Sequence, residues 1–115
     1  MDQECVFCNI VAGKIPATIL YQDDRVVAIR DINPYAPTHL LVMPKDHIPS
    51  LAELHDEHRE LIAHLIYVCN ELARRERIAE SGYRLVLNCG PDGGQEVPHL
   101  HAHLLGGEKL TIPIR

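Results

Sequence analysis

Positions 99–105, near the end of the chain, alternate histidine with small or apolar residues. Histidines stand at the first, third and fifth of these positions, and Leu100, Ala102 and Leu104 stand between or beside them. Since successive side chains of a β-strand point to opposite faces, this spacing predicts a strand with three imidazoles on one face. The opposite face of that strand is predicted to be apolar and to belong to the core.

The segment before this strand, residues 88–95, contains three glycines. Because glycine has no Cβ, backbone N–H groups in such a loop can approach an anion closely. An anion-binding loop that leads into a row of histidines points to phosphorus chemistry, in which a neutral imidazole attacks phosphorus. Clustered histidines also bind metals, and Glu108 has the spacing of a cupin-like ligand. A cupin barrel, however, needs more strands and one more histidine than follow here.

The length, composition and charge of the chain limit the kinds of protein that it can be. A chain of 115 residues, 46% of them hydrophobic but with no Trp and one Phe, predicts a single domain over residues 1–115 with an aliphatic core. The formal charge of −5 argues against a nucleic-acid or acidic membrane partner, so any phosphate site must be local. The first residues lack the pattern of a signal peptide and no apolar run reaches membrane-spanning length, which favours a cytoplasmic protein.

Helical and strand patterns follow one another along the chain. Apolar residues at helical spacing over 5–12 end at Gly13 and predict a short helix. A broad apolar stripe over 55–77 predicts the main helix, with His58 and His64 on or near its solvated polar side. Strands are predicted over 19–22, 26–30, 39–43, 83–87 and 99–105. Short helix, three strands, long helix and two strands make an α+β fold with an antiparallel sheet.

Cys5 and Cys8 form a Cys-x-x-Cys pair near the start of the chain. A thioredoxin-like redox pair is the usual alternative for this spacing, but it follows a strand in a βαβ unit, which this sequence lacks. Zinc suits the pair better, and a tetrahedral zinc site needs two further ligands. Two unliganded thiols on a short helix are the other interpretation.

Together these residues resemble the histidine-triad family, whose mark is His-φ-His-φ-His-φ-φ with φ apolar. The resemblance covers nearly the whole chain. Residues 104–107, at the end of the histidine segment, look most like the Hint branch of nucleoside phosphoramidases. The matching segments are 31–34, 37–45, 93–98 and 99–105.

The resemblance implies a fold and an activity. The fold is a five-stranded antiparallel sheet with one long and one short helix, paired into a ten-stranded sheet in a homodimer. The activity is hydrolysis of purine nucleoside 5′-phosphoramidates through a covalent nucleotidyl-histidine. Two alternatives stay open: a dinucleoside polyphosphate hydrolase of the same family, and a nucleotide-binding interaction module with vestigial turnover. A transferase is disfavoured because His103 stands where the nucleotidyltransferase branch carries glutamine.

The resemblance also assigns residues by position. His101 matches the nucleophile, His103 matches the histidine at the scissile phosphate and leaving group, and His39 and His99 match histidines of the same pocket. Asp31 matches the acid that binds the ribose hydroxyls. The phosphate contacts are matched by Asn88, Gly94, Gln95 and Glu96, and the base slot by Val6, Phe7, Ile10, Ile29 and Ile32. Val97 is a further residue matched to substrate binding.

The same resemblance implies one structural zinc ion per chain. Its ligands are matched by Cys5, Cys8, His47 and His99. Because four protein ligands leave no open coordination position for water, this metal is not expected to take part in catalysis.

Overall fold

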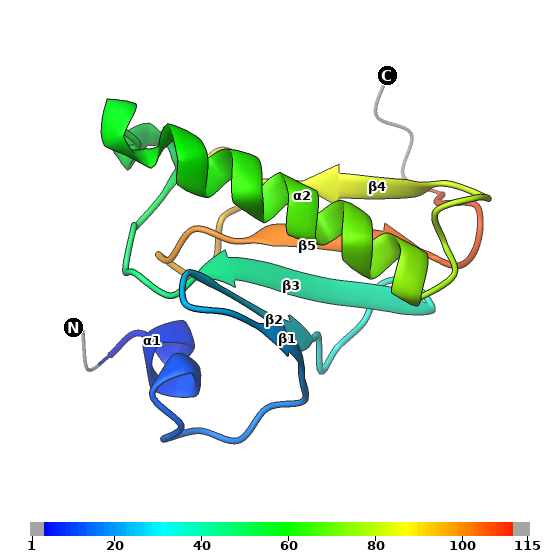
Figure 1. Ribbon diagram of the computed structural model, residues 1–115, viewed down its shortest axis with the longest axis horizontal. Coiled ribbons are helices and arrows are strands. Elements are labelled where there is room, and N and C mark those ends of the chain that lie inside the picture. The colour runs from blue at the N-terminus through cyan, green and yellow to red at the C-terminus, as the bar shows by residue number, and fades with distance from the viewer. Residues whose placement is uncertain (1–3, 112–115) are drawn as a thin grey trace.

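The computed structural model describes residues 4–111. Five antiparallel strands form one sheet, and the long helix α2 (Arg59–Arg75) lies across one of its faces (Figure 1). The short helix α1 (Val6–Val11) packs against the other face and ends before Gly13, which has a φ of 77°. In the order in which they lie side by side, the strands are β1 (Ile19–Gln22), β2 (Val26–Arg30), β3 (Thr38–Pro44), β5 (Ala102–Gly106) and β4 (Tyr83–Val86).

Strand β3 lies at the centre of the sheet and is buried along its whole length. Leu40 and Val42 belong to the core beneath α2, whereas Leu41 and Met43 belong to the core beneath α1. This alternation follows from the two-residue period of a strand. The continuous apolar run of β3 therefore serves two cores, one on each face of the sheet, and the α+β fold predicted from the sequence is confirmed.

Helix α2 begins later than the apolar stripe predicted. Two single turns of 3-10 helix, η1 (Leu51–Glu53) and η2 (Asp56–His58), precede it. The expectation that His64 faces solvent is wrong, because its Nε2 lies 2.6 Å from Asp23 Oδ2 in the turn between β1 and β2. The same carboxylate accepts a hydrogen bond from Tyr21. This hydrogen bond joins the first hairpin to the helix.

The strand predicted over 99–105 is wrong at its start, because β5 begins only at Ala102. The last strand pairs on this side are Val42 with Ala102 and Val86 with His103. Before them the backbone N–H groups bond elsewhere, that of His99 to Val97 and that of Leu100 to Ile48. Within β5 the predicted alternation persists, since Ala102 and Leu104 are buried in the core beneath α2 whereas His103 and Leu105 are only partly buried.

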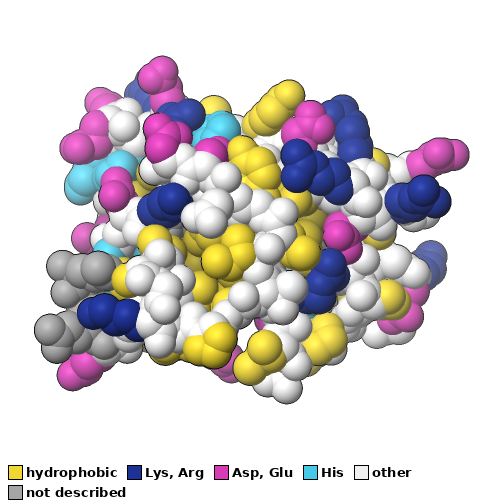
Figure 2. All heavy atoms as spheres, turned by 60° about the horizontal axis from the view of Figure 1, so that its bottom comes forward, with side chains coloured by type: hydrophobic (Ala, Val, Ile, Leu, Met, Phe, Trp, Pro, Cys, Tyr) yellow, Lys and Arg dark blue, Asp and Glu magenta, His cyan; other side chains and the backbone are white. Residues whose placement is uncertain are grey.

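The surface mixes charges of both signs. On the face drawn in Figure 2, Lys and Arg side chains are interspersed with acidic ones around apolar side chains. Within residues 4–111, none of the helices is long and apolar enough to span a bilayer.

Candidate active site and metal cluster

A cavity of about 230 Å³ opens on the face of the sheet that carries α1. Its walls come from α1, the loop after β2, the centre of the sheet and the segment that leads into β5. The residues that line it are Phe7, Asp31, Tyr35, Leu41, Asn88, Gly94, Glu96, Val97, His101 and His103.

The ring of His101 is fixed by the main chain. Its Nδ1 lies 2.7 Å from the carbonyl oxygen of His99. Since a carbonyl oxygen only accepts hydrogen bonds, Nδ1 must carry the hydrogen, and the neutral ring keeps its lone pair on Nε2. The edge of the Phe7 ring packs against this imidazole, with centroids 5.0 Å apart. In its neutral form, the form in which imidazole acts as a nucleophile, His101 has its one lone pair on Nε2.

A second main-chain contact fixes two further histidines. The N–H of Tyr35 donates to His39 Nδ1 at 3.1 Å, so the hydrogen of the neutral His39 ring lies on Nε2. That Nε2 is 2.9 Å from His103 Nδ1 and donates to it. His103 in turn must carry its own hydrogen on Nε2. The chain of bonds therefore makes His103 a hydrogen-bond donor, in contrast to His101.

Burial keeps these two rings neutral. Burial, together with the neighbouring His101 and His39, lowers the pKa of His103 to about 4, although the carboxylate of Asp31 acts in the opposite direction. Burial also lowers the pKa of His39, while the carboxylate of Asp31, 3.4 Å from His39 Nε2, acts in the opposite direction. At neutral pH the pair is uncharged, as the hydrogen-bond pattern requires.

The glycine loop over 88–95 is held in shape by one side chain. Gln95 Oε1 accepts the N–H of Gly90, and Gln95 Nε2 donates to the carbonyl oxygens of Pro49 and Val97. Gly94, with a φ of 82°, lies at the cavity wall, and its conformation is one that favours glycine. Gln95 thus shapes the loop, and Gly94 brings its main chain to the cavity.

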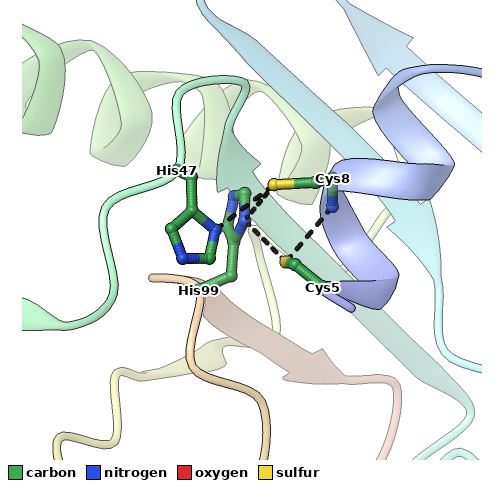
Figure 3. Close-up of side chains that lie close together, drawn as sticks. All are labelled: Cys5, Cys8, His47 and His99. Atoms are coloured by element: carbon green, nitrogen blue, oxygen red, sulfur yellow. Dashed lines mark hydrogen bonds between the residues drawn. The ribbon is translucent and has the colours of Figure 1, made fainter. Parts of the chain in front are cut away.

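A separate cluster joins Cys5, Cys8, His47 and His99, from α1, the loop after β3 and the segment before β5 (Figure 3). Its four possible ligand atoms lie within 4.8 Å of one another. His99 Nε2 is 2.8 Å from the carbonyl oxygen of Pro44, which leaves the lone pair on Nδ1, 3.3 Å from the sulfur of Cys5.

The spacing of this cluster suits a metal ion. Cys8 Sγ lies 3.2 Å from His47 Nδ1 and 3.6 Å from His99 Nδ1. In a tetrahedral zinc site, with Zn–S near 2.3 Å and Zn–N near 2.0 Å, sulfur and nitrogen ligands are about 3.5 Å apart. Both cysteines and His99 are buried, as a closed structural site requires. The residues present therefore fit zinc.

Asp31, His39 and His103 also lie within 4.8 Å of one another. Here, however, the lone pair of His39 is occupied by the N–H of Tyr35 and that of His103 by the N–H of His39. A metal ion would need those lone pairs and would displace the hydrogen between the rings. This group is a hydrogen-bond chain rather than a metal site.

Known proteins resemble this one over almost its whole length. The model of the HIT domain matches residues 12–110. The purine nucleoside phosphoramidase of Escherichia coli strain K12 is 47% identical over 110 residues, which cover 96% of this chain and 92% of that protein. The chain belongs to the HIT family.

Two other members of the HIT family bear on the fold and the metal cluster. A HIT family hydrolase from Clostridium thermocellum has a TM-score of 0.96 at 44% identity, and the match covers 100% of both chains. The 14 kDa zinc-binding protein of Zea mays is 45% identical over 114 residues, which cover 97% of this chain and 88% of that protein. The family, the fold and the hydrolase class predicted from the sequence are confirmed.

Some of the residues predicted for the site line the cavity, and the others lie elsewhere. Those that line the cavity are Phe7, Asp31, Asn88, Gly94, Glu96, Val97, His101 and His103. Ile10 and Ile29 lie in the core beneath α1, and the side chain of Ile32 is 90% exposed. His39 accepts the N–H of Tyr35 and donates to His103. One ring nitrogen of His99 bonds to the carbonyl oxygen of Pro44, and the other contacts the sulfur of Cys5. Val6 is 38% exposed.

Two cavity residues were missed in the sequence. Leu41 lies two positions after His39 on the same strand face, so strand alternation could have indicated it. Tyr35 lies in a proline-containing loop, and its side chain is 81% exposed. An aromatic residue in such a loop beside a candidate ribose-binding acid was the available signal.

Proposed function

We propose that this protein hydrolyses purine nucleoside 5′-phosphoramidates through a nucleotide bound covalently to His101. One observation carries the proposal: His101, with its lone pair on Nε2, and His103, with its N–H at Nε2, line one cavity with their ring centroids 5.0 Å apart. A nucleophile and a neighbouring donor are what displacement at phosphorus requires. The Escherichia coli relative is a purine nucleoside phosphoramidase, which supports the substrate class.

The remaining cavity residues suit a nucleotide. The carboxylate of Asp31 can accept two ribose hydroxyl hydrogen bonds, and its Oδ1 already accepts the N–H of Asn33, which fixes its orientation. The main chain around Gly94 and the side chain of Asn88 face the same space and suit phosphoryl oxygens. Phe7 and Val97 offer an apolar surface to the base. Ile10 and Ile29 are proposed to support this slot from the core behind Phe7, and the exposed Ile32 is proposed as its outer edge.

The proposed reaction has two steps. In the first, His101 Nε2 forms a bond to phosphorus, the P–N bond to the amine breaks, and the leaving nitrogen, which accepts a hydrogen bond from His103 Nε2, takes a proton from solvent. In the second, water attacks phosphorus, the bond between phosphorus and His101 Nε2 breaks, the proton of the water returns to solvent, and the nucleoside monophosphate leaves as His101 regains its lone pair. His39 holds the hydrogen of His103 on the nitrogen that faces the cavity. The carbonyl oxygen of His99 stabilises the positive charge on His101.

We propose that Cys5, Cys8, His47 and His99 hold one structural zinc ion. When bound, zinc would supply cross-links between α1, the loop after β3 and the segment before β5. The donor separations and the buried thiols support this, as does the name of the Zea mays relative. No step of the reaction is assigned to the metal, because four protein ligands would leave it no open position.

We also propose that residues 1–115 act as one domain in a cytoplasmic homodimer. Strand β4 lies at one edge of the sheet (Figure 1), and a second copy could continue the sheet there. Sedimentation at micromolar concentration is expected to give twice the chain mass. An active species with the mass of one chain would exclude the dimer.

The test of the reaction compares adenosine 5′-phosphoramidate with a diadenosine polyphosphate in steady state. We expect a higher kcat/KM for the phosphoramidate, and a rapid acid quench is expected to trap adenylate on His101. A preference for the dinucleotide would favour the polyphosphate hydrolase. Binding of adenosine monophosphate with turnover of neither substrate would favour the interaction module.

A further inference from the structure

A second cavity, of about 220 Å³, adjoins the first. Tyr35, Asn88 and His103 line both cavities. The proposed nucleophile His101 lines only the first, whereas Val86 and Leu105 line only the second. His103 therefore lies between the two cavities. The proposed binding of the nucleoside and its phosphate does not use the second cavity.

The position of the second cavity relative to His101 suggests what enters it. In a displacement at phosphorus the attacking and leaving atoms lie roughly in line, on opposite sides of the phosphorus. The nucleophile attacks from the wall of the first cavity, so the leaving group points away from that wall. The donor that would meet the leaving nitrogen is the N–H of His103, which borders the second cavity.

We propose that the second cavity receives the leaving amine and that Tyr35 is the residue that selects amines with a flat, apolar body. This inference rests on the proposed phosphoramidase function and adds to it the class of leaving group. Tyr35 is a specificity residue in this proposal, with no role in the chemical steps.

The walls of the second cavity favour such amines. Val86 pairs with His103 across β4 and β5, and Leu105 lies two positions after His103, so Val86, His103 and Leu105 share one sheet face. Val86 and Leu105 thus form an aliphatic floor beside the donor. The ring of Tyr35 borders the same space, and aromatic rings pack well against other flat rings. Arg84 also borders it, and a guanidinium plane packs against a flat ring in the same way.

The main chain and the side chain of Tyr35 make separate contacts. Its N–H donates to His39, while the residue as a whole is 81% exposed and its ring lies 5.8 Å from the His39 ring. The main chain of Tyr35 is thus anchored, and its largely exposed side chain is available to a ligand. A substitution of Tyr35 also leaves the main-chain bond to His39 in place, so the histidine chain is retained in the variant.

The test uses two substrates with the same nucleoside, adenosine phosphoramidates of ammonia and of 2-phenylethylamine. In Tyr35→Ala we expect the ratio of kcat/KM, phenylethylamine over ammonia, to fall about three- to tenfold relative to the wild type. Tyr35→Phe is expected to keep the wild-type ratio. Tyr67→Ala is the matched control, because Tyr67 is a 60% exposed tyrosine on α2, outside both cavities.

Two results would overturn the proposal. An unchanged ratio in Tyr35→Ala would show that the ring does not meet the leaving group. Equal weakening of both substrates and of adenosine monophosphate would place the ring against the nucleoside instead.

Binding separates this proposal from the proposed reaction. An analogue with CH₂ in place of the bridging NH of the phenylethylamine compound is expected to bind Tyr35→Ala more weakly than the wild type, with adenosine monophosphate unaffected. If the wild type hydrolyses neither phosphoramidate, the proposed function fails, and this comparison still decides what the second cavity accepts. Equal affinity of the analogue for both proteins would then overturn the proposal.

Discussion

The two histidine clusters of this protein use the same side chain in opposite ways. His99 and His101 are two residues apart, and each gives one ring hydrogen to a main-chain carbonyl oxygen. His99 does so through Nε2 and presents the lone pair of Nδ1 to two sulfurs, whereas His101 does so through Nδ1 and presents the lone pair of Nε2 to the cavity. The carbonyl partner therefore decides which nitrogen is available, and with it whether the ring suits a metal or a phosphorus atom.

The rest of each cluster follows the same distinction. Around His99, four atoms that can each offer a lone pair to a metal lie within 4.8 Å of one another. Around His103, donors and acceptors alternate from Tyr35 through His39. A short distance between histidine nitrogens is thus not by itself a sign of a metal site. Because the two clusters, among the residues described, share no hydrogen bond between histidine nitrogens, substitutions should disable each of them separately.

The largest effect is expected from His101→Ala. Loss of the nucleophile should lower kcat by on the order of 10³-fold or more, because the covalent step has no substitute. Metal content should stay that of the wild type, since His99 keeps its contacts with Pro44 and Cys5. Turnover, acid-trapped nucleotide and metal analysis on one preparation check this. Near-normal activity, or loss of metal together with activity, would contradict the separation.

The double variant Cys5→Ser, Cys8→Ser is expected to lose its metal and to remain active. Metal content should fall towards zero and Tm by on the order of 10 °C, because binding of a structural metal is coupled to folding. The loss in kcat should be smaller, less than about tenfold, because only the support of the segment before β5 is weakened. Cys89→Ser, at a half-buried cysteine outside the cluster, is the control for metal content. Wild-type protein purified without chelator or histidine tag that holds far less than one zinc per chain would refute the site.

The donor role of His103 is tested by His39→Gln. Without the His39 ring the hydrogen of His103 is no longer held on Nε2, and kcat should fall about 10- to 100-fold with little change in KM. Nitrogen NMR of His103 should show a mixed tautomer in the variant and the Nε2–H form in the wild type. His55→Gln, at an exposed histidine outside both clusters, is the control. A wild-type kcat in His39→Gln would mean that the hydrogen-bond chain is dispensable.

The lowered pKa of His103 should make the stability of the protein depend on pH. The pKa of His103 is about 4 in the fold and near 6.5 in an unfolded chain, so between these values the unfolded state binds more protons. Stability should therefore fall as the pH is lowered from about 6.5 to 4. Measuring Tm in the Cys5→Ser, Cys8→Ser background removes the contribution of metal release. Adding His103→Gln should flatten the curve, and an equally steep curve would refute the assignment.

The sequence predicted the elements better than the contacts between them. Alternation over residues 99–105 and the apolar run of β3 were enough to predict the sheet and its two faces, because strand period depends on neighbours in the chain. The hydrogen positions could not be predicted in the same way. His99 bonds to a carbonyl 55 residues away, and His64 to a carboxylate 41 residues away. The start of β5 was missed for the same reason, since Leu100 bonds to the distant Ile48.

The smallest effect is expected where the clusters touch. The Phe7 ring packs edge-on against both His99 and His101, with centroids 5.7 and 5.0 Å apart. Since such a contact contributes about 0.5–1.5 kcal/mol, Phe7→Leu should lower both zinc affinity and the rate of nucleotide transfer to His101, each about three- to tenfold. Val97→Ala, which changes the cavity wall without a ring contact to His99, should alter only the transfer rate. A change in one property alone in Phe7→Leu would assign this ring to a single cluster and leave the two uncoupled.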